Sequence, residues 1–214
     1  EAIERYCLAI FSKKNFIHAS IRELEERYLD PHCIVSLSVA QREKRKYRSS
    51  KFEEKSKFWW VKGFSLMQDK PIMIPAQLVY MPYHVHGEPI LRLPITTGAA
   101  SGTSERGAIL RGICEVVERD SFMIFYLNKL TPPKLDLSKT TDKTLIRIKE
   151  SYKRYNLFIH IFDISTDLPF TSIMVIIVDK TGIGPALSVG LKCSLSPLEA
   201  VVGAVEEAQQ IMSW

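Results

Sequence analysis

The chain has 214 residues, of which 46% are hydrophobic and 25% charged, and its 29 basic and 24 acidic side chains give a formal net charge of +5. These proportions are ordinary for a folded globular protein and exclude disorder over the whole chain. The excess of positive charge lies in one segment, Arg42 to Lys57, which has eight basic and three acidic residues. Composition therefore does not indicate a nucleic-acid-binding surface, which should spread its charge over a folded face.

In chain order, the spacing of apolar residues predicts these elements for the first half: helices at 1–12 and 17–27, strands at 34–39 and 58–66, and a short strand with a Pro-broken loop at 71–83. Asp30 and Pro31 are expected to close the second helix. The basic segment 42–57 lies between two predicted strands. We expect it to be a mobile loop that can contact an acidic peptide or partner.

In the second half, the small residues of 96–102 (TTGAASG) predict a loop that lets a ligand or another backbone come close. The elements predicted after it are the longest helix at 104–128, a helix at 141–155, strands at 158–163 and 170–179, and a further strand marked by glycines. A last helix begins at Ser196, with Pro197 at its first position and Glu199 closing a capping box. This order predicts an α+β fold, with helices packed on mixed or antiparallel sheets.

The four cysteines, at positions 7, 33, 114 and 193, lie far apart and form no CxxC pair. This spacing favours a reducing compartment, and we expect a cytoplasmic protein. The longest uninterrupted apolar run, Ile173 to Val178, has only the length of a strand. The sequence therefore predicts neither a membrane span nor a signal peptide.

A five-residue ExxER pattern occurs twice, each time opposite an apolar helix face. The two copies are Glu1, Glu4 and Arg5, and Glu115, Glu118 and Arg119. Two carboxylates one helical turn apart repel each other unless a cation lies between them, and Mg²⁺ typically takes one or two carboxylates together with nucleotide phosphates. Two such helices face to face would gather the side chains of a Mg-nucleotide site. A solvent-exposed polar face is the alternative.

A helical wheel divides the long helix into two faces. The apolar face has Ile109, Leu110, Ile113, Val116 and Val117, and the polar face has Arg111, Glu115, Glu118 and Arg119. The helix also begins directly after the small-residue loop. Its free N–H groups and the positive end of its dipole could therefore meet an anion.

The run ITTGAASGTSERGAILRGICEVVERDSF, with EAIERY at the start and EEAQQ at the end, resembles the YcaO family of ATP-dependent enzymes that modify peptide backbones. The segments WVKGFSL, IMIPAQLVYMPY and FDISTDLPF to GPALSVG extend the similarity over most of the chain. The resemblance implies a YcaO-like fold with a central nucleotide site. It further implies one ATP-binding domain over 1–214, the central part of a longer enzyme that has additional N- and C-terminal parts.

The resemblance also implies the site residues. Mg²⁺ ligands would be Glu1, Glu4, Glu115 and Glu118, and ATP-binding residues would be these four with Arg5, Thr103, Arg119, Glu207 and Gln210. The chain departs from the family pattern at Gly107, where a glutamate is usual and Glu105 could substitute, and at Thr97, where asparagine is common. The wheel places Glu207 opposite the apolar face of its helix, where solvent is expected.

The implied reaction is ATP- and Mg²⁺-dependent modification of a peptide backbone amide, with cyclodehydration of Cys, Ser or Thr to an azoline. Thioamide formation by the same activation is the close alternative. A catalytically idle peptide- or partner-binding subunit, suggested by Gly107, is the alternative from another class. The implied partners are a ribosomal precursor peptide or protein and a protein that delivers it, without nucleic acid or membrane; a homodimer is compatible with the sequence.

Overall fold

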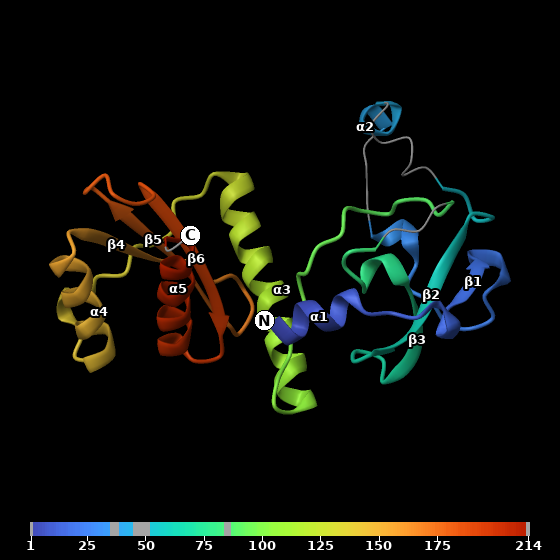
Figure 1. Cartoon of the computed structure of the whole chain (residues 1–214), viewed down its shortest axis with the longest axis horizontal. Helices are drawn as coiled ribbons and strands as arrows, with labels where there is room; N and C mark the ends of the chain where they lie inside the picture. Colours follow the sequence, from blue (N-terminus) through green and yellow to red (C-terminus); the bar gives the residue numbers. More distant parts are fainter. Residues whose placement is uncertain (1, 35–38, 45–51, 84–86, 213–214) are drawn as a thin grey trace. The chain divides into compact units, whose positions relative to one another are not determined.

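The computed structural model describes residues 2–34, 39–44, 52–83 and 87–212. The chain divides into two compact units, Glu1–Ser101 and Gly102–Trp214 (Figure 1). Within the described residues, each unit holds one antiparallel sheet of three strands, accompanied by helices. The predicted α+β fold is confirmed. In the described part of the chain, no helix has the length and apolar character needed to span a bilayer.

The sheet of the first unit has the strand order β1-β2-β3. Its strands are β1 (Ile17–Ser20), β2 (Lys57–Ser65) and β3 (Lys70–Pro75), preceded by helix α1 (Ala2–Ala9), with the short α2 (Val39–Glu43) between β1 and β2. Phe58, Trp60 and Met73 form its buried core together with Leu91 from the coil that follows. The helix predicted at the start of the chain and the strands predicted in 58–83 are thus confirmed.

The predicted helix at 17–27 is wrong, because its first residues form β1. Ile17 lies opposite Trp60 and Ala19 opposite Phe58 in the β1–β2 ladder. Both aromatic side chains are fully buried, and the Trp60 indole donates a 2.9 Å hydrogen bond to the carbonyl of Ala19. Local helix preference is weak, and burial against partners some 40 positions away outweighs it.

The basic segment 42–57 is only partly described. Residues 45–51 lie outside the described residues, as do residues 35–38 of the strand predicted at 34–39, so the mobility of the segment and that strand stay predictions. The described C-terminal end of the basic segment makes ion pairs on the surface of the first unit. Arg22 lies 2.7 Å from Glu54, and Lys57 lies 3.3 Å from Glu23.

Within its described residues, the second unit contains the sheet β4-β5-β6 and three α-helices. In order they are α3 (Glu105–Asn128), α4 (Lys143–Arg154), β4 (Leu157–Asp163), β5 (Thr171–Asp179), β6 (Leu187–Ser194) and α5 (Pro197–Met212), all close to the predicted positions. Helices α4 and α5 cover one face of the sheet, and α3 lies alongside β6 (Figure 1). The core between α5 and the sheet is built from isoleucine and valine on the strands and alanine on the helix.

Candidate functional site

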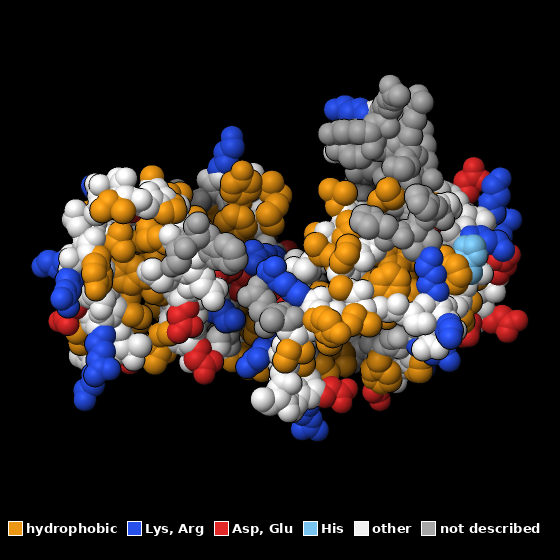
Figure 2. All heavy atoms as spheres, in the orientation of Figure 1, with side chains coloured by type: hydrophobic (Ala, Val, Ile, Leu, Met, Phe, Trp, Pro, Cys, Tyr) orange, Lys and Arg blue, Asp and Glu red, His pale blue; other side chains and the backbone are white. Residues whose placement is uncertain are grey.

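Helix α3 packs on the sheet through a stripe that the sequence did not indicate. The residues of this stripe, at positions i, i+3, i+4 and i+7, are Cys114, Val117, Glu118 and Ser121. On the predicted apolar face, Leu110, Ile113 and Val116 are 40–49% exposed, and Figure 2 shows hydrophobic side chains at the surface over the C-terminal end of α3. The interpretation of the ExxER face as solvent-exposed is therefore wrong for Glu118, which is 6% exposed.

The Glu118 carboxylate is held by the edge of the sheet. Among the strands that the structure describes, β6 pairs only with β5, so alternate backbone N–H groups on its other side need partners. The N–H of Cys193 donates a 3.1 Å hydrogen bond to Oε2 of Glu118. One helical turn further on, the hydroxyls of Ser121 and Ser172 lie 3.2 Å apart and connect α3 to β5.

The Glu207 carboxylate is held by the same strand edge. Two residues before Cys193, the N–H of Leu191 donates a 2.6 Å hydrogen bond to Oε2 of Glu207 on α5. Helix α5 can approach β6 this closely because Gly190 has no side chain: a Cβ there would collide with the backbone of Ala204 and Ala208. The expectation that Glu207 faces solvent is wrong, since its side chain is only 34% exposed.

Arg119 lies beside both carboxylates. Its Nη2 is 3.6 Å from Oε1 of Glu118 and 3.8 Å from Oε1 of Glu207, and its side chain is 44% exposed. Each carboxylate thus uses one oxygen for the strand backbone and turns the other toward the guanidinium. The result is a compact group of two carboxylates and one arginine at the outer edge of β6.

The surroundings of Glu118 make its charged form costly. Burial and then the nearby charge of Glu207 raise the pKa of Glu118 to about 7, against the opposing effects of Arg119, Lys192 and the Cys193 N–H. Near neutral pH the protonated and ionised forms of this carboxyl are therefore both populated. A cation that approached the two carboxylates would favour the ionised form.

The comparison with known families identifies the architecture. The family model described as "YcaO cyclodehydratase", ATP- and Mg²⁺-binding, matches residues 1–214. The chain belongs to the YcaO family. The family is described as binding ATP and Mg²⁺, so the recognition made from the sequence motifs is confirmed.

Solved YcaO-type structures share the fold of this YcaO chain. A heterocyclase in complex with substrate and cofactor matches 99% of the chain and 30% of its own length, with a TM-score of 0.87 and 24% identity. YcaO from Methanopyrus kandleri, bound with AMPPCP and Mg²⁺, matches 100% of the chain and 50% of its own length, with a TM-score of 0.68 and 20% identity. At these identities the likeness establishes the heterocyclase fold.

A curated relative is also similar in sequence. An uncharacterized protein of Methanothermobacter thermautotrophicus is 28% identical over 158 residues, which are 73% of this chain and 41% of the relative. The YcaO chain thus spans less than half the length of this relative, and half or less of the two solved structures.

The remaining predicted site residues differ in their exposure to solvent. Glu115 is partly buried on α3, one turn before Glu118. Thr103, just before the Ser104 cap of α3, is exposed, as is Gln210 on α5. In the first unit, Glu4 is partly buried and Arg5 exposed on α1, whereas Glu1 lies outside the described residues. The structure thus groups Glu118, Arg119 and Glu207 within one unit.

The observed group fits a Mg²⁺-nucleotide better than a metal held by protein alone. Within the described ranges, no three His, Cys, Asp or Glu side chains are arranged to hold a metal ion. Mg²⁺ commonly needs only one or two carboxylates, because water and phosphate oxygens complete its shell. Glu118 and Glu207 could supply these carboxylates, and Arg119 could pair with phosphate oxygens.

Sequence reasoning missed Lys192, which follows Leu191 on β6. Its aliphatic stem packs over Gly203 of α5, where a Cβ would lie 2.8 Å from the lysine Cγ, and its charge lowers the pKa of Glu118. The available signal was the helical spacing of small residues along α5, at positions 200, 203, 204 and 208, because small side chains let another backbone come close to the helix.

Proposed function

We propose that this YcaO protein uses ATP and Mg²⁺ to activate a peptide backbone amide, with cyclodehydration of Cys, Ser or Thr to an azoline as its reaction. The observation that carries the proposal is the group formed by Glu118, Arg119 and Glu207 at the edge of β6. Each carboxylate keeps one oxygen that is not bonded to the strand, and both of these oxygens face a partly exposed arginine.

The geometry suggests a division of roles among these side chains. The N–H groups of Leu191 and Cys193 orient the carboxylates, so that Oε1 of each is available to a metal ion bound to phosphate. Arg119 could exchange its long contacts of 3.6 and 3.8 Å for shorter bonds to phosphate oxygens. These side chains would position the nucleotide and stabilise negative charge during phosphoryl transfer.

The proposed reaction conserves atoms as follows. A Cys, Ser or Thr side chain of the peptide loses its S–H or O–H proton as it attacks the preceding amide carbon, and the resulting oxyanion attacks the γ-phosphate of ATP, releasing ADP. The C–O bond then breaks with phosphate as the leaving group, and the nitrogen loses its proton to leave a C=N bond. The peptide thereby loses one water, and a poor leaving group is replaced by a good one.

Further residues belong to the proposal through the family resemblance. They are Glu1, Glu4 and Glu115 as metal ligands, and Arg5, Thr103 and Gln210 as nucleotide-binding residues. A ribosomal precursor peptide and a protein that delivers it are the proposed partners, because the similar heterocyclase was solved with a substrate.

The proposal is tested by nucleotide binding and turnover in the intact protein. Isothermal titration with ATP at millimolar Mg²⁺ should show binding to the wild type, weakened tenfold or more by Glu118→Gln, which removes one charge-assisted interaction. Glu206→Gln, at an exposed position of α5, is the matched control and should bind like the wild type. Unchanged ATP affinity in Glu118→Gln would show that the group at β6 is not the nucleotide site.

A catalytically idle subunit is the second candidate, and Gly107 favours it. The residue occupies the first turn of α3, where its N–H donates a 3.2 Å bond to Ser104 and no carboxylate is available at its own position. ATP hydrolysis that depends on Glu118 would exclude this candidate. Mass spectrometry of the peptide product separates the remaining two reactions, since an azoline forms by loss of water and a thioamide by exchange of oxygen for sulfur.

A further inference from the structure

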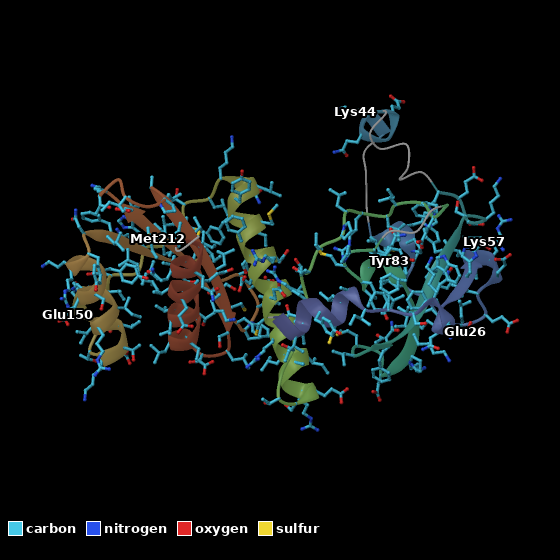
Figure 3. All side chains as sticks on the ribbon, viewed as in Figure 1. Glu26, Lys44, Lys57, Tyr83, Glu150 and Met212 are labelled. Carbon is cyan, nitrogen blue, oxygen red and sulfur yellow. The ribbon has the colours of Figure 1, made fainter. Side chains whose placement is uncertain are left out.

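Two of the four cysteines lie close together in the second unit. Cys114 is on the stripe of α3 that packs on the sheet, one helical turn before Glu118, and Cys193 is on β6. The N–H of Cys193 bonds to Glu118 at 3.1 Å, so this part of α3 lies against this part of the strand. Side chains from α3 and β6 fill the space between the two elements (Figure 3). The contact thus joins two cysteines that the sequence keeps far apart.

The thiols of Cys114 and Cys193 interact directly. Burial raises the pKa of the Cys193 thiol to about 11, against a hydrogen bond with the Ser172 hydroxyl, and a hydrogen bond with the Cys114 thiol raises it further. Ser172 is the cross-strand partner of Cys193, and its hydroxyl lies 3.2 Å from that of Ser121 on α3. Helix α3 therefore contacts the sheet at two adjacent positions, and at one of them two free thiols meet.

The two cysteines differ in their exposure to solvent. Cys193 is 2% exposed, whereas Cys114 is partly exposed. A small oxidant such as hydrogen peroxide therefore reaches Cys114 first. A buried thiol that keeps its proton is a poor nucleophile, so Cys193 does not react with the oxidant by itself. The arrangement gives Cys114 the role of the thiol that is oxidised first and Cys193 that of the neighbour that completes a bond to it.

We propose that Cys114 and Cys193 form a reversible disulfide, with a peroxide as the oxidant, and that this bond regulates the site around Glu118. The Cys114 sulfur attacks one oxygen of hydrogen peroxide, the O–O bond breaks, and a sulfenic acid and one water form. The Cys193 sulfur then attacks the sulfenic sulfur, and its S–H proton leaves with the hydroxyl group as a second water. The two thiols lose two electrons in total, which reduce the peroxide.

The disulfide changes the geometry around Glu118. It brings the two sulfur atoms closer than two thiols in contact, so α3 must shift against β6 one turn away from Glu118. The shift alters the 3.1 Å bond from the Cys193 N–H to Glu118 and the 3.6 Å contact between Glu118 and Arg119. We therefore expect the oxidised protein to bind Mg²⁺–ATP more weakly. This effect on ATP rests on the proposed function, whereas the disulfide itself does not.

Mass spectrometry detects the bond in the intact protein after treatment with hydrogen peroxide and digestion with trypsin under non-reducing conditions. Trypsin cuts after Arg111, Arg119 and Lys192, so Cys114 and Cys193 fall in different peptides. The two peptides should appear as one linked species that lacks the two thiol hydrogens. Dithiothreitol should separate them again, whereas it does not restore oxidised methionine.

Isothermal titration with Mg²⁺–ATP measures the effect of the bond on the site. The oxidised wild type should bind about fivefold more weakly than the reduced wild type, and dithiothreitol should restore the affinity. Cys114→Ser should bind like the reduced wild type with or without peroxide. Cys33→Ser is the matched control: it removes an exposed thiol from the first unit and should keep the sensitivity to peroxide.

The two measurements separate this proposal from the proposed function. If no linked peptide forms, or if the linked and reduced proteins bind Mg²⁺–ATP equally, the switch is overturned and the proposed function stays intact. Linked peptides from a protein that binds no Mg²⁺–ATP when reduced would support the disulfide and contradict both the proposed function and its regulation. Sensitivity to peroxide that persists in Cys114→Ser would also overturn the switch, since another residue would then be responsible.

Discussion

Replacement of Glu118 by glutamine should stabilise the protein at alkaline pH. Glutamine has nearly the same shape, and its carbonyl oxygen can still accept the N–H of Cys193. Burial raises the pKa of Glu118 from 4.5 to about 7 in the folded protein. The folded state therefore holds the proton more tightly than the unfolded state, and stability falls as the pH rises from the unfolded to the folded pKa.

The pKa difference gives the size of the effect. A shift from 4.5 to about 7 corresponds to about 3 kcal/mol between the two protonation states, so wild-type unit 2 should lose roughly this stability between pH 4 and pH 8. Glu118→Gln has no such group to ionise. It should therefore be more stable than the wild type by about 3 kcal/mol at pH 8, and by less than about 1 kcal/mol at pH 4.5.

Urea unfolding, monitored by hydrogen exchange with mass spectrometry, measures this difference in stability for the second unit alone. The peptides to follow come from α3 and β6. Glu206→Gln, an exposed position on α5, controls for the loss of one negative charge and should change stability by less than about 0.5 kcal/mol. Mg²⁺–ATP should reduce the advantage of Glu118→Gln, because it binds the wild type more tightly. If Glu118→Gln is no more stable than the wild type at pH 8, burying the ionised carboxylate of Glu118 costs no free energy of folding, and the reasoning is refuted.

Three further substitutions test separate features. Gly190→Ala should destabilise the second unit by about 2 kcal/mol or more in thermal unfolding, because its Cβ would meet the backbone of α5, whereas Gly203→Ala would meet only a flexible lysine stem and should be tolerated. Gly107→Glu should tighten Mg²⁺–ATP binding in isothermal titration by restoring the carboxylate usual in the family, and Gly107→Ala, which adds no carboxylate, should not. Asp142→Ala should cost about 1 kcal/mol in urea unfolding through loss of the α4 cap, and Asp142→Asn should cost much less.

Local signals were enough to predict most elements of the second unit. Ser104 before α3 and Asp142 before α4 cap these helices, with the N–H groups of Gly107 and Thr144 among the donors. Strands β4 and β5 were indicated by short apolar runs with clear ends. These features depend on neighbours within a few residues, so the sequence alone contains the necessary information.

Features that depend on distant partners were not predictable in the same way. Ile17 belongs to a strand because of Trp60, and the helical spacing after it gave the wrong element. The wheel placed Glu118 on the polar face of its helix, with solvent exposure as the alternative to a ligand site, and it placed Glu207 where solvent is expected. A wheel contains no information about a strand edge that needs hydrogen-bond acceptors. The amide that binds Glu118 is 75 positions away in the sequence, and only the folded sheet brings the two together.

Packing alone does not account for Glu118. One turn further along the same stripe of α3, the contact between helix and sheet is made by two neutral hydroxyls, Ser121 and Ser172, at 3.2 Å. A hydroxyl or an amide at position 118 could likewise accept the N–H of Cys193, without the cost of burying a charge beside Glu207. The chain instead keeps a carboxylate there and places Arg119 next to it. A bound cation would favour the ionised forms of Glu118 and Glu207 together, so the two carboxylates would contribute to its binding free energy. The arrangement is therefore better explained by a ligand than by stability.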